Sequence, residues 1–119
     1  MPLHPNAGKK PAADSLIDPS ELVTAFFTLK PDVTVPAQRV SFGTSGHRGS
    51  SLGKAFNEAH LLAVAQAVAD HRKEQRITGP LYLGFDSHAL SYPAFATVLR
   101  VLVANAVNVR FEDRQMTPT

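Results

Sequence analysis

The strongest constraint on the fold is a regular alternation of strand and helix patterns that begins at Val40. Apolar segments at 40–43, 81–85 and 107–111 have the length and composition of strands. Between them, two stretches carry apolar residues spaced three and four positions apart, as on one buried face of a helix: Leu61, Val64, Ala65 and Val68, then Phe95, Val98, Leu99 and Leu102. The alternation predicts an α/β fold with right-handed crossovers.

Residues that begin and end helices support the same pattern. Asn57 is a candidate N-cap, and Glu58 after it favours the positive helix start. Gly79-Pro80 predicts the stop after the first helix, and Pro93 predicts the opening of the second. Asn105 is a candidate left-handed C-cap of that second helix.

Two segments precede the alternating unit. Residues 1–18 hold three prolines and two lysines with almost no large apolar groups, which predicts a mobile arm. Residues 19–39 are predicted to form a short helix, capped by Asp18 or Ser20, and an extended linker. Residues 40–119 then form the α/β unit, which we expect to be a truncated domain because so few strands leave an unprotected sheet edge.

A loop rich in glycine and hydroxyl side chains follows the first predicted strand. Seven of the nine residues from Gly43 to Ser51 are Gly, Ser or Thr, and Arg48 lies among them. Glycine allows a ligand to approach the backbone, hydroxyls donate and accept hydrogen bonds, and the arginine fork fits an oxyanion. The composition favours a phosphate site, with a turn-rich surface loop as the alternative.

The loop matches none of the general phosphate-binding or nucleophile motifs. Arg48 stands where a Walker loop has its second glycine, and Ser45 stands where the dinucleotide fingerprint needs glycine. His47 replaces the glycine that a nucleophile elbow around Ser45 requires. A triad of Ser45, His47 and Asp86 is disfavoured, because such residues are common and nothing else supports it.

A second polar loop, Asp86-Ser87-His88, follows the second predicted strand. Ligands of α/β proteins gather at the carboxyl ends of strands, so both loops are expected to face one cleft. The alternative is a turn in which Asp86 satisfies its own backbone, and the spacing alone favours that turn.

Several classes of protein are disfavoured by composition. Twelve Lys and Arg against ten Asp and Glu give a net charge of +2, too small to indicate a nucleic-acid protein. There is no cysteine, no run of about 20 apolar residues and no signal-peptide core, so a cytoplasmic protein away from membranes is expected. No histidine pair has zinc-site spacing. His60 and His71 fall on the first predicted helix and are expected to be boundary or solvent residues, and no bound metal is expected.

The segment Phe42-Gly-Thr-Ser-Gly-His-Arg-Gly49 resembles the first motif of the phosphoglucomutases, within the α-D-phosphohexomutase superfamily. The resemblance is collinear over about residues 15 to 119 and is nearest to the bacterial branch. It includes Phe56-Asn57-Glu58, Ile77-Thr-Gly-Pro80, Gly84-Phe-Asp-Ser-His-Ala-Leu-Ser91 and Thr117-Pro118-Thr119.

The resemblance implies a partial first domain of the phosphohexomutase fold, a mixed sheet with packed helices and a flexible N-terminal arm. It implies an enzyme that interconverts glucose 1-phosphate and glucose 6-phosphate through a phosphoserine and a glucose 1,6-bisphosphate intermediate, with Mg²⁺. Carried over to this chain, Arg48 contacts the phosphoserine or the bisphosphate, and Thr44, Ser45 and His47 line the same pocket.

The chain also departs from the family pattern. The catalytic Thr-x-Ser-His-Asn-Pro motif and the Asp-rich magnesium loop are absent and are expected beyond Thr119, so no catalytic or metal residue is predicted in this chain. His88 stands where many relatives have arginine, which fits the phosphoglucomutase branch. We expect a phosphosugar substrate, the remaining domains of a parent enzyme as partners, and no activity of the chain alone. The alternatives are a stand-alone anion-binding or interaction module, and a small phosphatase-like enzyme that uses Ser45.

Overall fold

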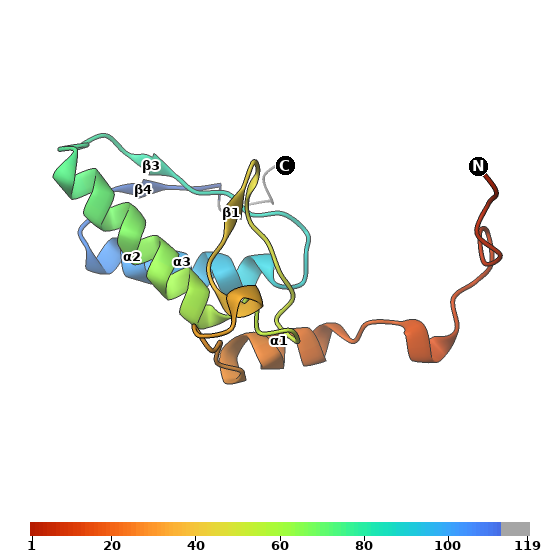
Figure 1. Ribbon diagram of the computed structural model, residues 1–119. Coiled ribbons are helices and arrows are strands. Elements are labelled where there is room, and N and C mark those ends of the chain that lie inside the picture. The colour runs from red at the N-terminus through yellow and green to blue at the C-terminus, as the bar shows by residue number, and fades with distance from the viewer. Residues whose placement is uncertain (113–119) are drawn as a thin grey trace.

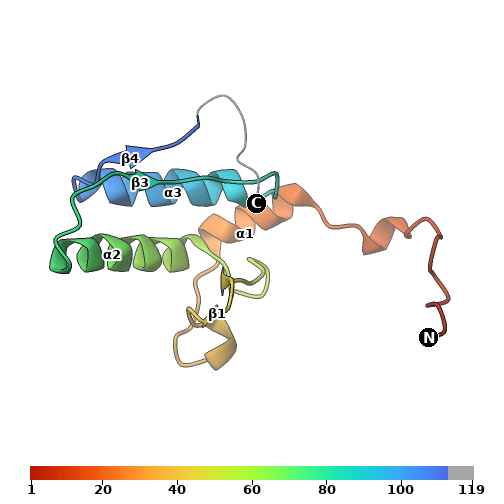
Figure 2. The ribbon, with the colours of Figure 1, turned by 90° about the horizontal axis from the view of Figure 1, so that it is seen from above.

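The computed structural model describes residues 1–112. Its elements are η1 (Ala13–Ser15), α1 (Pro19–Thr28), η2 (Pro36–Gln38), β1 (Phe42–Gly43), β2 (Gly46–His47), α2 (Glu58–Glu74), β3 (Leu81–Tyr82), α3 (Ser91–Ala104) and β4 (Val109–Arg110), in the order seen in Figure 1. Residues 1–20 are exposed, and the arm extends away from the helices in both views (Figures 1 and 2). The predicted mobility of the arm stays a prediction, and Thr117-Pro118-Thr119 lies outside the described residues.

The strands of the described chain form two separate ladders. β3 and β4 pair in parallel, with Leu81 opposite Val109, and α3 connects them. This β3–α3–β4 unit confirms the α/β prediction. β1 and β2 pair antiparallel, with Phe42 opposite His47, so the two kinds of pairing do not share a sheet within residues 1–112.

The first part of the glycine-rich loop is therefore a hairpin. Gly43 lies opposite Gly46, which leaves Thr44 and Ser45 as the connection between the strands. Gly46 has a φ of +111°, in the region where glycine is favoured. The sequence analysis predicted an irregular loop from Gly43 onward, and it missed this turn because the return strand is only two residues long.

Helices α2 and α3 lie side by side and pack against each other, and β4 packs along α3 (Figure 2). Phe26 of α1 and Leu102 of α3 are the largest apolar side chains that are fully buried. Full burial of such a side chain stabilises a fold by about 1.5–3 kcal/mol. Ala65 and Ala69 are the buried apolar residues of α2, whereas the predicted face member Val68 is 37% exposed.

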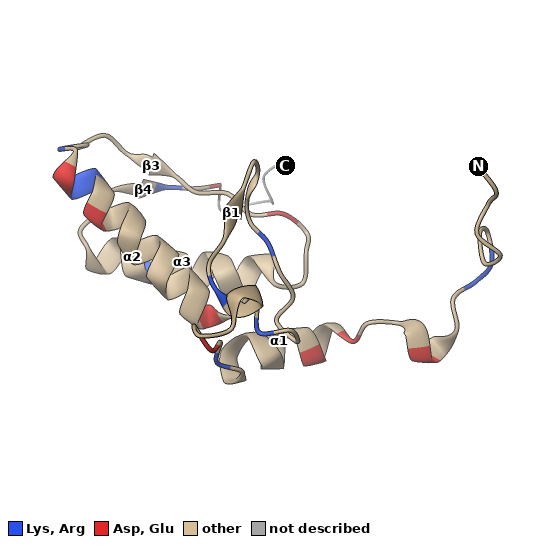
Figure 3. Ribbon diagram, viewed as in Figure 1, with Lys and Arg blue, Asp and Glu red and all other residues tan. Residues whose placement is uncertain are grey.

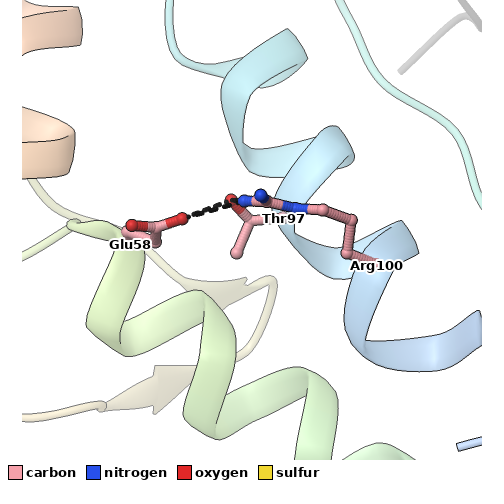
Figure 4. Close-up of polar contacts among 3 residues, drawn as sticks. All are labelled: Glu58, Thr97 and Arg100. Carbon is pink, nitrogen blue, oxygen red and sulfur yellow. Dashed lines mark hydrogen bonds and ion pairs between the residues drawn. The ribbon is translucent and has the colours of Figure 1, made fainter. Parts of the chain in front are cut away.

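A polar contact also joins α2 to α3, as Figure 4 shows. Glu58 Oε1 accepts hydrogen bonds from Arg100 Nη2 at 3.1 Å and from Thr97 Oγ1 at 3.2 Å. The Arg100 side chain is 71% exposed, so solvent weakens the ion pair, whereas Thr97 is fully buried.

The helix starts were largely predictable, and the ends less so. Asp18 caps α1 by accepting from Ser20 N at 2.8 Å, and Asn57 occupies the N-cap of α2, as predicted. α2 ends at Glu74, before Gly79-Pro80, and Arg76 after it has a φ of +54°.

The prediction of a left-handed conformation at Asn105 is wrong. Its φ is −91°, and Ala106 has the positive value, +57°. The Asn105 side chain instead donates to Val101 O and to Gln66 Oε1, both at 2.9 Å. It therefore ends α3 with a side-chain contact to α2.

Candidate functional site

A cavity of about 930 Å³ lies between the hairpin segment and the Asp86 loop. Ser45, His47, Arg48 and Gly49 line one wall, and Gly84, Phe85, Asp86, His88 and Ser91 line the other. Apolar side chains in and just before α2 and α3 complete the lining, among them Phe56, Leu61, Leu90 and Val98. The expectation that both polar loops face one cleft is confirmed, although their strands belong to different ladders.

Arg48 is the cation of the hairpin wall. Its side chain is exposed and makes no hydrogen bond or ion pair with any residue of the part of the chain that the structure describes. A guanidinium without a protein partner beside a polar cavity can bind an oxyanion through two parallel hydrogen bonds.

Gly49, just after the hairpin, lies against the backbone of Ala55. A Cβ atom on Gly49 would lie 2.6 Å from the carbonyl oxygen of Ala55, closer than real Cβ contacts. The loop therefore packs directly on the backbone of Ala55, and only glycine fits there without a shift.

His47 is oriented by aromatic neighbours. Its ring stacks on Phe56, with centroids 5.9 Å apart, and its Nδ1 lies 3.1 Å from Ser41 N. Its Nε2 is buried and has no hydrogen-bond partner within residues 1–112. It is one of two buried side-chain nitrogen or oxygen atoms without a hydrogen-bond partner in this part of the chain, the other being Asn57 Oδ1.

The Asp86 loop forms the self-satisfied turn that the spacing favoured. Asp86 Oδ1 accepts a hydrogen bond from the Ser91 hydroxyl and another from His88 N at 2.9 Å. The Ser91 hydroxyl and then the His88 amide hold the pKa of Asp86 below the ordinary range of an aspartate. The second wall thus carries a negative charge at neutral pH, opposite in sign to Arg48.

The residues of the disfavoured triad are not connected. Asp86 bonds to residues of its own loop, and His47 Nδ1 lies at Ser41. No hydrogen bond joins Ser45, His47 and Asp86 in the described chain, so Ser45 has no activating base there.

The other predicted contact, Thr44, lies at the exposed hairpin connection, next to the lining residue Ser45. Residues 1–112 hold no group of three or more His, Cys, Asp or Glu side chains that could bind a metal ion. None of the helices in this part of the chain has both the length and the apolar character to cross a membrane. Charges of both signs are interspersed along the ribbon (Figure 3).

Buried polar residues anchor the far end of the loop, and the sequence analysis missed this role. Ser51 Oγ donates to Leu22 O at 2.8 Å, and Asn57 Nδ2 donates to Ala25 O at 2.9 Å and to Ser51 O at 3.1 Å. These bonds fasten the loop to the last turns of α1. The cap position of Asn57 was visible in the sequence, but no local signal indicates contact with a helix more than 30 residues earlier.

His60 is the second residue that the sequence analysis misjudged. The expectation of a boundary or solvent position is wrong, since His60 is only 3% exposed. It is buried because both ring nitrogens find partners: Nδ1 accepts from Asn57 N at 2.9 Å, and Nε2 lies 2.8 Å from Gln38 O. His71, near the other end of α2, is exposed as expected.

Comparisons with known proteins agree with the fold. Residues 39–119 match the family model described as phosphoglucomutase/phosphomannomutase, alpha/beta/alpha domain I. The chain is also 51% identical over 118 residues to a protein named phosphoglucomutase from Komagataeibacter xylinus. That match covers 98% of this chain and 21% of the relative. The chain belongs to the phosphoglucomutase/phosphomannomutase family, and its residues 39–119 correspond to the first domain of that family.

Proposed function

We propose that this chain supplies one wall of a phosphoglucomutase active site that interconverts glucose 1-phosphate and glucose 6-phosphate. The reaction passes through a phosphoserine and a glucose 1,6-bisphosphate intermediate. The observation that carries the proposal is Arg48, a guanidinium that has no hydrogen-bond or ion-pair partner among residues 1–112 and lies on the wall of a cavity of about 930 Å³. Phosphoryl transfer depends mainly on positioning and charge stabilisation, which such a group supplies.

The neighbours of Arg48 have complementary roles in this proposal. The Ser45 and Thr44 hydroxyls at the hairpin connection donate hydrogen bonds to phosphate oxygens. His47 lines the same wall beside Arg48. Across the cavity the Asp86 carboxylate, an acceptor only, suits the hydroxyl groups of a sugar.

The remaining chemistry is assigned to other parts of a parent enzyme. The described residues lack a cluster fit to hold Mg²⁺, so no step involving the metal is derived from them. We propose that the phosphorylated serine and the magnesium ligands belong to segments outside this chain, and that the other domains close the site. A cytoplasmic location is part of the same proposal, and cell fractionation tests it.

The proposal is tested by titrating glucose 1,6-bisphosphate into the uniformly ¹⁵N-labelled chain and recording NMR spectra. We expect shifts concentrated at 44–49 and 86–91, weak affinity, and no response to glucose at the same concentration. Absence of any shift with the bisphosphate would contradict the proposal. In a coupled assay the chain alone is expected to give no mutase turnover, and turnover above background would show that the serine chemistry is misplaced.

The same experiments distinguish the alternatives. A stand-alone binding module predicts that no catalytic serine motif follows Thr119 in the reading frame. A phosphatase-like enzyme predicts release of inorganic phosphate that is lost in a Ser45→Ala variant. The proposed mutase predicts the serine motif and no phosphate release.

A further inference from the structure

The proposed function leaves His60 without a role, although it is among the most buried polar residues described. It lies in the first turn of α2, where its Nδ1 accepts from Asn57 N. A nitrogen that accepts carries no proton, so the ring is the neutral tautomer whose Nε2 donates to Gln38 O at 2.8 Å. Two hydrogen bonds from different segments therefore fix the plane of this ring.

The fixed ring contacts the residue that precedes Arg48. The centroids of His60 and His47 lie 5.2 Å apart, with an interplanar angle of 33°. His47 also stacks on Phe56 at an angle of 10°. His60 lies in the first turn of α2 and Phe56 lies two residues before that helix, so the segment around the start of α2 provides both ring contacts of His47.

The hairpin strands have few other contacts. They are two residues long each and pair only with one another in the described chain. Phe42 is 64% exposed, so the first strand buries little apolar surface. Ser41 N donates to His47 Nδ1 beside the ladder, and the ring contacts of His47 with Phe56 and His60 pack β2 against the segment around the start of α2.

We propose that His60 is a positioning residue for Arg48: its ring holds the ring of His47, and His47 in turn directs the adjacent Arg48 toward the cavity. This inference rests on the proposed anion site and names a residue that determines its geometry. His60 touches no ligand in this scheme and acts only through His47.

A role limited to capping α2 is the competing explanation, and two variants separate the roles. His60→Gln keeps an acceptor for Asn57 N and a donor for Gln38 O but removes the ring. His60→Phe keeps a ring beside His47 but removes both hydrogen bonds. A pure cap therefore predicts damage only in the Phe variant.

The test combines three measurements on both variants and the unchanged chain: the dissociation constant of glucose 1,6-bisphosphate, the melting temperature, and the NMR contacts of the His47 ring without ligand. For His60→Gln we expect a dissociation constant about two- to tenfold higher, the range that an aromatic pair accounts for, with a smaller loss of melting temperature than in His60→Phe. We also expect loss of the contact between His47 and Phe56 and shifted Arg48 amide signals.

An unchanged dissociation constant, together with intact His47 contacts in His60→Gln, would overturn the proposal. The ring contacts are measured without ligand, so they decide the positioning role even if the unchanged chain binds no bisphosphate. If the unchanged chain binds no bisphosphate, the proposed function fails, whereas the ring contacts of His47 still show whether His60 positions the hairpin.

Discussion

Replacing Asn57 with alanine is expected to loosen both the core and the loop that carries Arg48. Asn57 is fully buried, and its Nδ2 donates to Ala25 O at 2.9 Å and Ser51 O at 3.1 Å. Each lost hydrogen bond lowers the free energy of unfolding by about 0.5–1.5 kcal/mol. The expected total for the two bonds of Nδ2 is about 1–3 kcal/mol.

Urea denaturation followed by circular dichroism measures this loss, and Asn105→Ala is the matched control. Asn105 is exposed, and its bonds to Gln66 and Val101 are open to water, so the same truncation is expected to lower the free energy of unfolding by less than about 1 kcal/mol. A loss below about 1 kcal/mol for Asn57→Ala, or one equal to the control, would refute the reasoning that Asn57 anchors the loop to α1.

Three further predictions concern packing and charge. Gly49→Ala places a Cβ 2.6 Å from the carbonyl oxygen of Ala55 and is expected to lower the free energy of unfolding by about 1–3 kcal/mol, as urea denaturation measures. The pKa of Asp86 is lowered in the folded chain, so its hydrogen bonds stabilise the fold at pH values above the pKa of an unfolded aspartate, and this stabilisation is lost as the pH falls through the pKa of folded Asp86. In Asp86→Asn the melting temperature is therefore expected to fall less steeply as the pH is lowered. Arg100→Ala is expected to lower the free energy of unfolding by no more than about 1 kcal/mol, because that ion pair is exposed to solvent.

The helices could be predicted because their signals are local. Asp18 and Pro19 lie next to the turn that they start, and the apolar spacing of α3 is a property of one segment. The conformation at the end of α3 was harder to predict, because the residue there contacts a side chain that is distant in the sequence. Asn105 has a φ of −91°, and its side chain bonds to Gln66, 39 residues away, a contact that the local sequence does not indicate.

The site was predictable in composition but less so in geometry. Arg48 and the shared cleft followed from the residues themselves, whereas the hairpin that presents Arg48 depends on pairing between two-residue strands. The burial of His60 depends on Gln38 O, 22 residues earlier, and on the ring of His47. Neither neighbour can be read from the periodicity of α2, which places His60 beside the predicted apolar face.

The anion-binding role of Arg48 is tested most directly by comparing Arg48→Gln with Arg110→Gln in calorimetric titrations with glucose 1,6-bisphosphate. Arg110 is also exposed but lies on β4, away from the lining of the large cavity. Loss of charge-assisted hydrogen bonds at Arg48 is expected to raise the dissociation constant about 10- to 100-fold, while the Arg110 variant binds like the unchanged chain. Equal affinity in all three proteins would contradict the assignment of this cavity as the phosphate site.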